Sequence, residues 1–559
     1  MNSLDQLTAS FFAFITTEFF KGESNNDVLR SINFDLNTDA QKQQFGDISS
    51  NAAMVLAKLL QKNPRAVAQQ ITEKFSHPLI ARTEIAGPGF INLFLNPQAF
   101  QQLTSELYEQ KNDFFKKSLE EPTLHYSLEF VSANPTGPLH IGHGRGGIIG
   151  DVLARILEIR GHNVTTEFYI NDAGNQIKKL GESFKIRCLQ QLAQNDTSTE
   201  PLTIPEDGYA GEYLIELAQT CIAQYGNTLA TQPLEFFENY AKETLLNNIK
   251  TTLAQYGITF DVWFSEKTLH ESGAIAHAIT LLQRHGFIYE KDDALWFAST
   301  QFGDDKDRVV KKSSGELTYV AADIAYLINK IDRGFNKLIM VLGQDHHSYV
   351  VRLKAVLAAL KHNPADLDVI LYQLVTLKES GELVRLSKRA GRIVSLHDII
   401  TTVGTDVARF FYLNRKADAH LEFDIALALK KTDENPVYYI QYAYVRTASI
   451  LEKAQTITDT TTISIVDAQG LSPSEYLLLK KIISLKQVLE SINKTYSTHM
   501  LAYYIIELAH LFHSYYAVHR VINAEDIPTT RARLLLIILL RRTFATCMEL
   551  LGVSRPERM

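Results

Sequence analysis

The sequence predicts an α/β fold built on a doubly wound parallel sheet, with an α+β region before it and an all-helical region after it. Residues 126–131 and 164–170 are two apolar runs, and residues 148–157 between them carry apolar side chains at helical spacing. A strand, a helix and a second strand in this order form a βαβ unit, from which doubly wound sheets are built. The sheet is therefore expected to be the core of the chain.

The composition is typical of a soluble globular chain with several domains. The 559 residues are too many for one compact core, and 45% hydrophobic and 21% charged residues are ordinary proportions. The longest strongly apolar run, residues 534–540, is too short to span a membrane, and no basic residue precedes Lys21. Neither a membrane helix nor a signal peptide is expected. The net charge of −7 does not exclude RNA as a partner, because local basic faces can bind it.

Cysteine and histidine spacing argues against metal sites. Cys188, Cys221 and Cys547 are far apart and form no CxxC pair. We therefore expect neither disulfides nor structural zinc, and a cytoplasmic location. His346 and His347 are adjacent, but no third or fourth ligand follows at a helpful spacing, so no metal site is predicted.

Residues 1–115 are expected to form the first module. Residues 52–60 and 66–75 have helical composition, and residues 85–94 indicate a glycine turn that enters a strand. From this pattern alone, a small α+β domain without a ligand is the favoured interpretation.

A tight turn and two histidines follow the first strand of the predicted core. Residues 134–138 are Asn-Pro-Thr-Gly-Pro, and His140-Ile141-Gly142-His143 comes next. The unpaired N–H groups of a helix N-terminus suit a phosphate, Gly142 allows close approach to the backbone, and both histidines can donate hydrogen bonds to phosphate oxygens. Two histidines that only cap a helix are the alternative. The strand before them and the helix after them favour a nucleotide site.

Tyr319 and Asp323 are four residues apart, which places them on one face of a helix in an otherwise apolar setting. A carboxylate among alanines is costly unless a cation pairs with it. The cation could be an arginine or lysine of the protein, or a guanidinium ligand that matches the carboxylate with two parallel hydrogen bonds. The pattern leaves both alternatives open.

Two further segments are basic or aromatic. Residues 379–392 form a predicted hairpin that is rich in arginine and lysine, and such a basic loop by itself is usually a solvated surface. Tyr438, Tyr442 and Arg446 are four apart on one predicted helix face. Aromatic residues at this spacing are more often core than ligand contacts, and stacking on nucleic-acid bases is the alternative.

These motifs resemble those of a known family. His140-Ile141-Gly142-His143 resembles the HIGH signature of class I aminoacyl-tRNA synthetases, and residues 129–138, EFVSANPTGP, resemble arginyl-tRNA synthetases in particular. Residues 385–389, RLSKR, resemble the KMSKS signature, with Arg385 and Leu386 where lysine and methionine are usual. The resemblance covers nearly the whole chain.

The resemblance implies three domains: an N-terminal add-on tRNA-binding domain at 1–115, a Rossmann-type catalytic domain at 116–402 with a connective insertion at about 190–288, and a helical anticodon-binding domain at 403–559. It also implies roles for individual residues. The catalytic residues would be His140, His143 and Lys388, and the ATP-binding residues Pro138, Gly142, His143, Ser387, Lys388 and Arg389. Arginine would be bound by Glu129, Ser132, Asn134, Tyr319, Asp323 and Gln344, and tRNA by Phe90, Asn92, Tyr438, Tyr442, Arg446 and Met559.

The implied reaction has two steps. The carboxylate of L-arginine attacks the α-phosphorus of ATP, which is bound with Mg²⁺, and the arginyl group then passes to the 2′-hydroxyl of the terminal adenosine of tRNA(Arg). A monomer is expected. Two rivals remain: another nucleotidyltransferase with an HxGH motif, which would need no tRNA, and a non-catalytic tRNA-binding relative, which would be expected to lose His140, His143 or Lys388.

Overall fold

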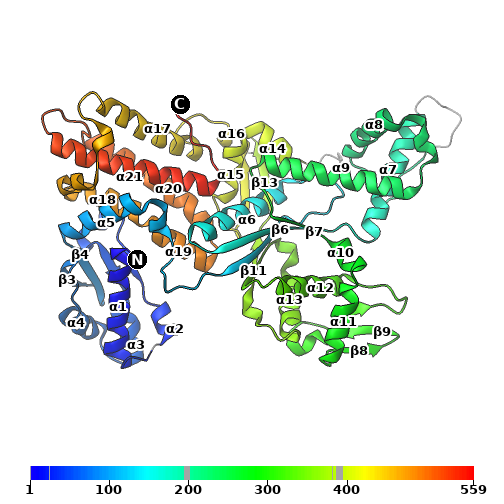
Figure 1. Ribbon diagram of the computed structural model, residues 1–559, viewed down its shortest axis with the longest axis horizontal. Helices are drawn as coiled ribbons and strands as arrows, with labels where there is room; N and C mark the ends of the chain where they lie inside the picture. The colour runs from blue at the N-terminus through cyan, green and yellow to red at the C-terminus, as the bar shows by residue number, and fades with distance from the viewer. Residues whose placement is uncertain (1, 24, 194–201, 380–381, 385–393) are drawn as a thin grey trace. The chain divides into compact units, whose positions relative to one another are not determined.

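The computed structural model describes residues 2–23, 25–193, 202–379, 382–384 and 394–559 (Figure 1). Two compact units are present. The first contains residues 1–122, 159–161 and 431–559, and the second contains residues 123–158 and 162–430, each within the described ranges.

The first unit begins with a four-stranded antiparallel sheet and its helices. The strand order is β1-β2-β4-β3, with β1 at Phe34–Leu36, β2 at Ile48–Ser50, β3 at Ile80–Ala86 and β4 at Phe90–Leu95. The helices are α1 (Ser3–Phe20), α2 (Asn26–Arg30), α3 (Ala52–Leu60), α4 (Pro64–Lys74) and α5 (Pro97–Gln110), with 3-10 turns η1 (Ala40–Phe45) and η2 (Lys111–Phe115). The predicted α+β module and its glycine turn are confirmed, because Gly87 and Gly89 both have positive φ between β3 and β4.

The rest of the first unit is helical. It contains α17 (Pro436–Ala454), α18 (Pro473–Ile483), α19 (Leu485–Thr495), α20 (His499–Val518) and α21 (Ile527–Leu551), with η9 (Thr460–Thr462) and η10 (Ile465–Gly470). The apolar run at 534–540 lies in the middle of α21 and is buried as core. Among the described helices, none has the length and apolar character needed to cross a membrane. The helices join the antiparallel module through Lys480–Asp47 (2.8 Å) and Lys486–Asp5 (2.9 Å) ion pairs.

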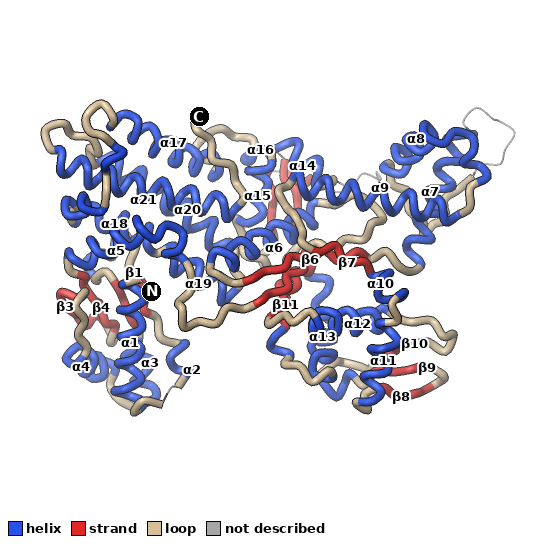
Figure 2. The backbone as a smooth tube through the Cα atoms, viewed as in Figure 1, coloured by secondary structure: helices blue, strands red, loops and turns tan. Residues whose placement is uncertain are grey.

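The second unit is built on a five-stranded parallel sheet, as predicted, with the order β12-β11-β5-β6-β7 (Figure 2). The strands are β5 (His125–Phe130), β6 (Asn163–Ile170), β7 (Val262–Ser265), β11 (Lys337–Gly343) and β12 (Leu367–Tyr372). The chain adds β6 and β7 on one side of β5, and β11 and β12 on the other. Helix α6 (Ile141–Ile159) lies on one face, and α12 (Tyr319–Asp332) and α13 (His347–Ala359) lie on the other (Figure 1).

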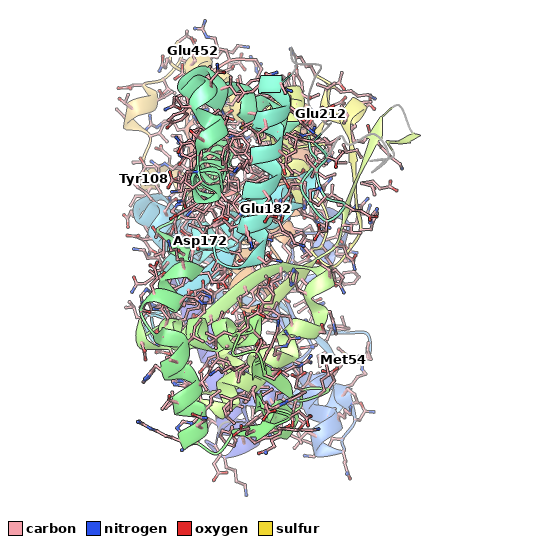
Figure 3. The ribbon with its side chains drawn as sticks, turned by 90° about the vertical axis from the view of Figure 1, so that its right-hand side faces the viewer. Met54, Tyr108, Asp172, Glu182, Glu212 and Glu452 are labelled. Carbon is pink, nitrogen blue, oxygen red and sulfur yellow. The ribbon has the colours of Figure 1, made fainter. Side chains whose placement is uncertain are left out.

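Between β6 and β7 the chain forms a helical insertion with its own core. It comprises α7 (Asn175–Leu192), α8 (Tyr213–Tyr225), η4 (Gly226–Thr231) and α9 (Leu234–Gln255), packed around Phe184, Leu214 and Phe237. Glu182 lies on α7, and Glu212 directly precedes α8 (Figure 3). The predicted insertion bounds of about 190–288 are wrong at both ends, since α7 begins at Asn175 and β7 belongs to the parallel sheet. A four-residue strand gives too little periodicity to be recognised in sequence.

The other elements of the second unit surround this sheet. A small sheet of order β10-β9-β8 contains β8 (Ile288–Lys291), β9 (Ala294–Phe297) and β10 (Arg308–Lys311), and it follows α10 (Glu266–Glu271) and α11 (Ala274–Arg284). The remaining pieces are η5 (Ser299–Phe302), η6 (Gln344–His346), η7 (Pro364–Asp366), β13 (Val375–Glu379), β14 (Glu382–Val384), α14 (Leu396–Val403), α15 (Thr405–Leu413), β15 (Leu421–Asp424) and α16 (Ile425–Ala428). The predicted hairpin is present as far as Val384. An all-helical region from residue 403 is wrong, because β15 pairs with β13 and the second unit extends to Lys430.

Helix α6 lies unusually close to the sheet because it carries glycines on its inner face. A methyl group at Gly150 would lie 2.2 Å from the buried ring of Phe130, the last residue of β5. The buried Arg145 of the same helix donates hydrogen bonds to the carbonyl oxygens of Gln373, Lys416 and Ala419. Helix α6 therefore contacts the end of β5 and holds the segments that precede β13 and β15.

We predict that Gly150→Ala lowers the free energy of unfolding by about 1–3 kcal/mol, because the added methyl group overlaps a packed aromatic ring rather than a movable side-chain end. Urea denaturation measures the change in the free energy of unfolding, in the transition of the second unit. Gly147→Ala on the same helix is the matched control, since its methyl group would meet only the ends of Ile258 and Val131, at 3.0 and 3.3 Å. Equal losses in the two variants would contradict this account.

Candidate active site

The candidate site lies at the carboxyl edge of the parallel sheet, where the strand order reverses. Strands β5, β6 and β11 are adjacent and parallel, so the segments that follow them meet at one edge. Ser132 and Asn134 follow β5, Asp172 follows β6 (Figure 3), and Gln344 follows β11.

The backbone after β5 is strained. Val131 has φ 68° and Ser132 has φ 42°, and positive φ is costly for a β-branched residue. The Ser132 hydroxyl donates to Glu129 Oε1 (3.0 Å) and accepts the backbone N–H of Tyr169 from β6 (3.1 Å). These bonds stabilise the turn that leads to Asn134.

Glu129 is held from behind by a buried cation. Its carboxylate lies 2.9 Å from Lys330 Nζ and accepts a hydrogen bond from the Tyr326 hydroxyl (3.0 Å). Lys330 is also 3.1 Å from Glu167, whose other oxygen pairs with Arg333 at 2.5 Å. Two buried carboxylates thus face two cations of the protein, and both negative charges are compensated.

Asp323 is in a different electrostatic environment. It lies half-buried on α12, and burial raises its pKa to about 7, with further increases from the charges of Glu266 and Glu129. A hydrogen bond from the Tyr349 hydroxyl and the positive charge of Arg352 act in the opposite direction. Arg352 is the protein cation that acts on Asp323, and together with the Tyr349 hydroxyl it offsets the effect of burial only in part.

Glu266 is a second buried acid, whose charge acts on Asp323, and the sequence did not reveal it. It is the first residue of α10, directly after β7, and is 5% exposed. Burial raises its pKa, and its side chain bonds to Tyr169. Recognition of β7 as a strand of the main sheet would have placed Glu266 at the same edge.

Tyr319, the other member of the predicted pair, begins α12 and is 65% exposed. Gln344 is half-buried in the turn that follows β11. Tyr349, three residues after His346, contacts Asp323, whereas the charge of Asp345 acts on His140. The short segment 344–349 therefore carries groups that act on both Asp323 and His140.

The two histidines are stacked and electrically neutral. Their ring centroids are 3.6 Å apart. The backbone N–H of His140 donates to His143 Nδ1, and the backbone N–H of Gly142 donates to His140 Nδ1, both at 3.1 Å. Because each Nδ1 is an acceptor, the proton of each ring is on Nε2 and is available to a ligand. Burial lowers both pKa values, that of His143 to about 3. Gly142 also leaves room for the His140 ring, which a methyl group there would crowd at 3.0 Å.

Ser387, Lys388 and Arg389, together with Arg385 and Leu386, lie outside the described residues. The described chain on the far side of that segment returns to the histidines. Ser395 forms a bridge with His140, and the N–H of Leu396 donates to the carbonyl oxygen of Leu139 at 2.8 Å. Pro138 is exposed beside this pairing.

The residues expected to contact tRNA lie in the first unit and differ in exposure. Phe90 is 39% exposed on β4, whereas Asn92 is 3% exposed and packs beside Gly46. Tyr438 is half-buried and Met559 is exposed. Tyr442 is 39% exposed, so it is not a core residue.

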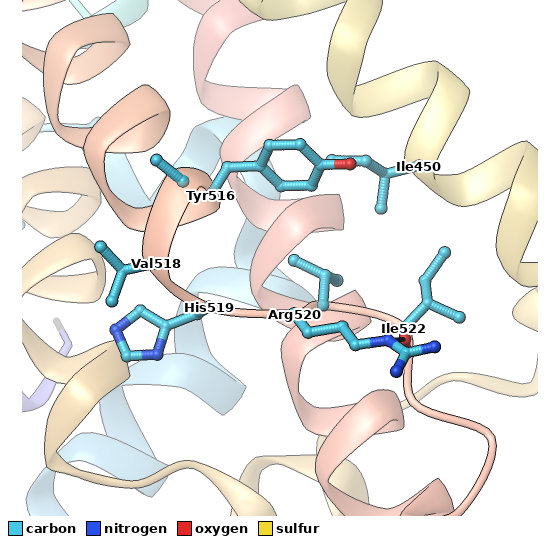
Figure 4. A pocket seen from close by; sticks show the side chains of 8 residues that line it. Ile450, Tyr516, Val518, His519, Arg520 and Ile522 are labelled. Atoms are coloured by element: carbon cyan, nitrogen blue, oxygen red, sulfur yellow. Dashed lines mark hydrogen bonds between the residues drawn. The ribbon is translucent and has the colours of Figure 1, made fainter.

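Tyr442 belongs to an aromatic and cationic cluster. Its hydroxyl accepts a hydrogen bond from Arg446 Nη2 at 2.8 Å, and the same guanidinium lies 4.9 Å from the ring of Tyr442 and 5.1 Å from that of Tyr516. Tyr516 also lines a pocket of about 450 Å³ with Ile450, His519 and Arg520 (Figure 4). Partly exposed aromatic rings with a cation beside them suit nucleic-acid bases.

Within the described ranges, no three histidine, cysteine or acidic side chains are placed to hold a metal ion. Cys188, Cys221 and Cys547 are free thiols and buried.

Comparison with known proteins agrees with this geometry. The family profile described as "tRNA synthetases class I (R), catalytic domain" matches residues 103–417. The profile "Arginyl tRNA synthetase N terminal domain" matches residues 24–95, and "DALR anticodon binding domain" matches residues 440–559.

Similar proteins carry the same family name. An arginine–tRNA ligase from Syntrophotalea carbinolica is 41% identical over 549 residues, 97% of each chain. One from Moorella thermoacetica is 42% identical over 526 residues, 92% of each chain. The arginyl-tRNA synthetase structure from Plasmodium falciparum has the same fold, with a TM-score of 0.77 over 100% of both chains at 19% identity. The chain therefore belongs to the arginyl-tRNA synthetase family of class I aminoacyl-tRNA synthetases.

Proposed function

We propose that the chain is an arginine–tRNA ligase, which uses ATP to activate L-arginine and transfers it to the 2′-hydroxyl of the terminal adenosine of tRNA(Arg). One observation carries the proposal: an incompletely compensated acidic pocket and a pair of neutral N–H donors share one edge of the sheet. The first is complementary to a guanidinium and the second to phosphates.

Arginine enters with its guanidinium toward Asp323 and Glu266. The planar guanidinium group of arginine donates parallel hydrogen bonds to carboxylates. The ammonium group of lysine cannot form this pair of bonds, and citrulline lacks the positive charge that strengthens them. Tyr319, on the same helix face as Asp323, covers the side chain. Ser132, Asn134 and Gln344 orient the α-amino end, and Glu129 acts chiefly by holding Ser132.

ATP lies along the turn from Pro138 to His143, with its phosphates toward the start of α6. The Nε2–H groups of His140 and His143 donate to phosphate oxygens. Ser387, Lys388 and Arg389 supply the remaining contacts, and Lys388 stabilises the charge on departing pyrophosphate. Mg²⁺ would accompany the ATP phosphates and reduce their negative charge.

The chemistry requires no covalent enzyme intermediate. An oxygen of the arginine carboxylate forms a bond to the α-phosphorus while the bond from that phosphorus to the β-phosphate oxygen breaks, giving arginyl-adenylate and pyrophosphate. The 2′-hydroxyl oxygen then attacks the arginyl carbonyl carbon, and AMP leaves. Both Nδ1 atoms accept hydrogen bonds from backbone amides and the ring protons lie on Nε2, so the histidines contribute by positioning and by donating hydrogen bonds.

tRNA recognition is assigned to the first unit. Phe90 and Tyr442 offer exposed aromatic faces, Arg446 offers a cation between two rings, and Tyr438 and Met559 extend this surface. Asn92 would contact a base only if the β4 region opened around it. For the functional domains we propose 1–115, 116–430 and 431–559, so the second boundary lies at Lys430 and not at the expected residue 402. The proposal further includes a cytoplasmic location, a monomeric state and no structural zinc.

We predict that ATP–pyrophosphate exchange requires arginine and tRNA(Arg) together, because the family resemblance implies that activation waits for bound tRNA. Exchange is measured with each amino acid, with and without tRNA. Another HxGH nucleotidyltransferase would give exchange without tRNA or with a different acceptor, and a non-catalytic relative would give none.

Asp323→Ala should raise the KM for arginine at least about 30-fold, because a guanidinium loses its charged partner at a desolvated site. tRNA affinity, measured by filter binding, should stay nearly unchanged. Asp332→Ala is the matched control, since Asp332 is an exposed acid at the other end of α12. Unchanged arginine kinetics in Asp323→Ala would remove this assignment.

Arginine binding to the free enzyme should weaken about tenfold from pH 8 to pH 6. The pKa of Asp323 is about 7, so the carboxyl group is mostly ionised at pH 8 and mostly protonated at pH 6, and only the ionised form pairs with the guanidinium. Titration calorimetry at both pH values measures the ratio. Asp323→Asn should abolish this dependence; a ratio that persists in Asp323→Asn would assign it to another group.

A further inference from the structure

Tyr213, the first residue of insertion helix α8, contacts the nucleotide turn. Its hydroxyl donates a hydrogen bond of 2.6 Å to the carbonyl oxygen of Thr136. Its ring lies against Gly137, where a methyl group would be 3.4 Å from the ring and hydroxyl atoms. Burial raises the pKa of this tyrosine, so its hydroxyl stays protonated and remains a donor. A residue of the insertion thus holds the backbone two residues before Pro138.

The turn has little means of fixing itself. Gly137 has no side chain to restrict its backbone, and Pro138 has no N–H to donate. An external hydrogen bond to the Thr136 carbonyl oxygen therefore limits where the next residues lie. Pro138 and Tyr213 also line one groove of about 770 Å³ with Gln255 and Ser395, and Ser395 is the residue that bridges to His140.

The other end of the insertion is fixed to the core. After α9, the carbonyl oxygen of Tyr256 accepts from Arg409 Nη1 (2.8 Å), that of Gly257 from Arg155 Nη2 (3.1 Å) and that of Gln255 from the Thr405 hydroxyl (3.2 Å). Helices α7, α8 and α9 pack around one apolar core, so they form a continuous body between this anchor and Tyr213. The position of the insertion is therefore transmitted to the turn.

We propose that Tyr213 is a positioning residue for ATP, and that the helical insertion thereby sets the geometry of the nucleotide turn. The proposal rests on the proposed function, because it assumes that ATP binds along residues 138–143. Tyr213 touches backbone and not the reacting atoms, so its loss should affect ATP more than arginine.

Tyr213→Phe keeps the ring on Gly137 and removes the hydroxyl. We expect the KM for ATP in tRNA-dependent pyrophosphate exchange to rise about three- to tenfold, as for loss of a neutral hydrogen bond. The KM for arginine and the thermal unfolding temperature should stay unchanged. Gly211→Ala tests the same contact without changing Tyr213. Its methyl group would lie 2.3 Å from the Tyr213 ring and would displace the ring from Gly137. It should raise the KM for ATP in the same direction.

Tyr225→Phe is the matched control, since it makes the same chemical change at the last residue of α8. An unchanged KM for ATP in Tyr213→Phe overturns the proposal, as does an equal rise in Tyr225→Phe. Equal effects on the KM values of ATP and arginine, with a lower unfolding temperature, would indicate a structural role and also overturn it. Absence of exchange in the unmodified enzyme would instead remove the proposed function.

Discussion

The parallel pairing of β5 with β6 and β11 is the constraint on which the site depends. These three strands end at one edge, and the reversal of strand order on either side of β5 leaves space there for a ligand. Each group of the site is placed by this pairing. Ser132 and the histidine turn follow β5, and the Tyr169 amide that holds Ser132 belongs to β6. The segment after β11 carries Tyr349, which bonds to Asp323, and Asp345, whose charge acts on His140. The glycines of α6 allow that helix to begin beside the same edge.

Charge compensation separates the acids of the core into two classes. Glu129 and Glu167 are paired with Lys330 and Arg333 and hold the framework. Asp323 and Glu266 have raised pKa values, because burial opposes their ionisation more than nearby cations and donors favour it. A cationic ligand would compensate the charges of Asp323 and Glu266 and leave the ion pairs of Glu129 and Glu167 intact. The framework is thus stable without substrate, while the pocket retains a preference for positive charge.

The two histidines of the turn carry no charge in the free protein. Two protonated imidazoles stacked at 3.6 Å would repel each other, and burial together with the neighbouring ring keeps them neutral. Backbone amides occupy both Nδ1 atoms, so the Nε2 protons remain for a ligand. In the proposed function, the positive charge needed for phosphates comes from the start of α6 and from Lys388 and Arg389, which lie outside the described residues.

The sequence by itself determined the fold class, the family and the histidine turn. These depend on local patterns, namely apolar periodicity, Pro and Gly punctuation and contiguous motifs, which can be recognised without knowing the contacts. Only the tertiary structure revealed that β7 and β15 are strands, because four-residue segments acquire that conformation from pairing with distant strands. It likewise added Glu266 to the pocket, assigned Glu129 to a buried ion pair and brought Tyr213 to Thr136, 77 residues away. Burial and charge compensation arise between residues far apart in the chain, so no local pattern contains them.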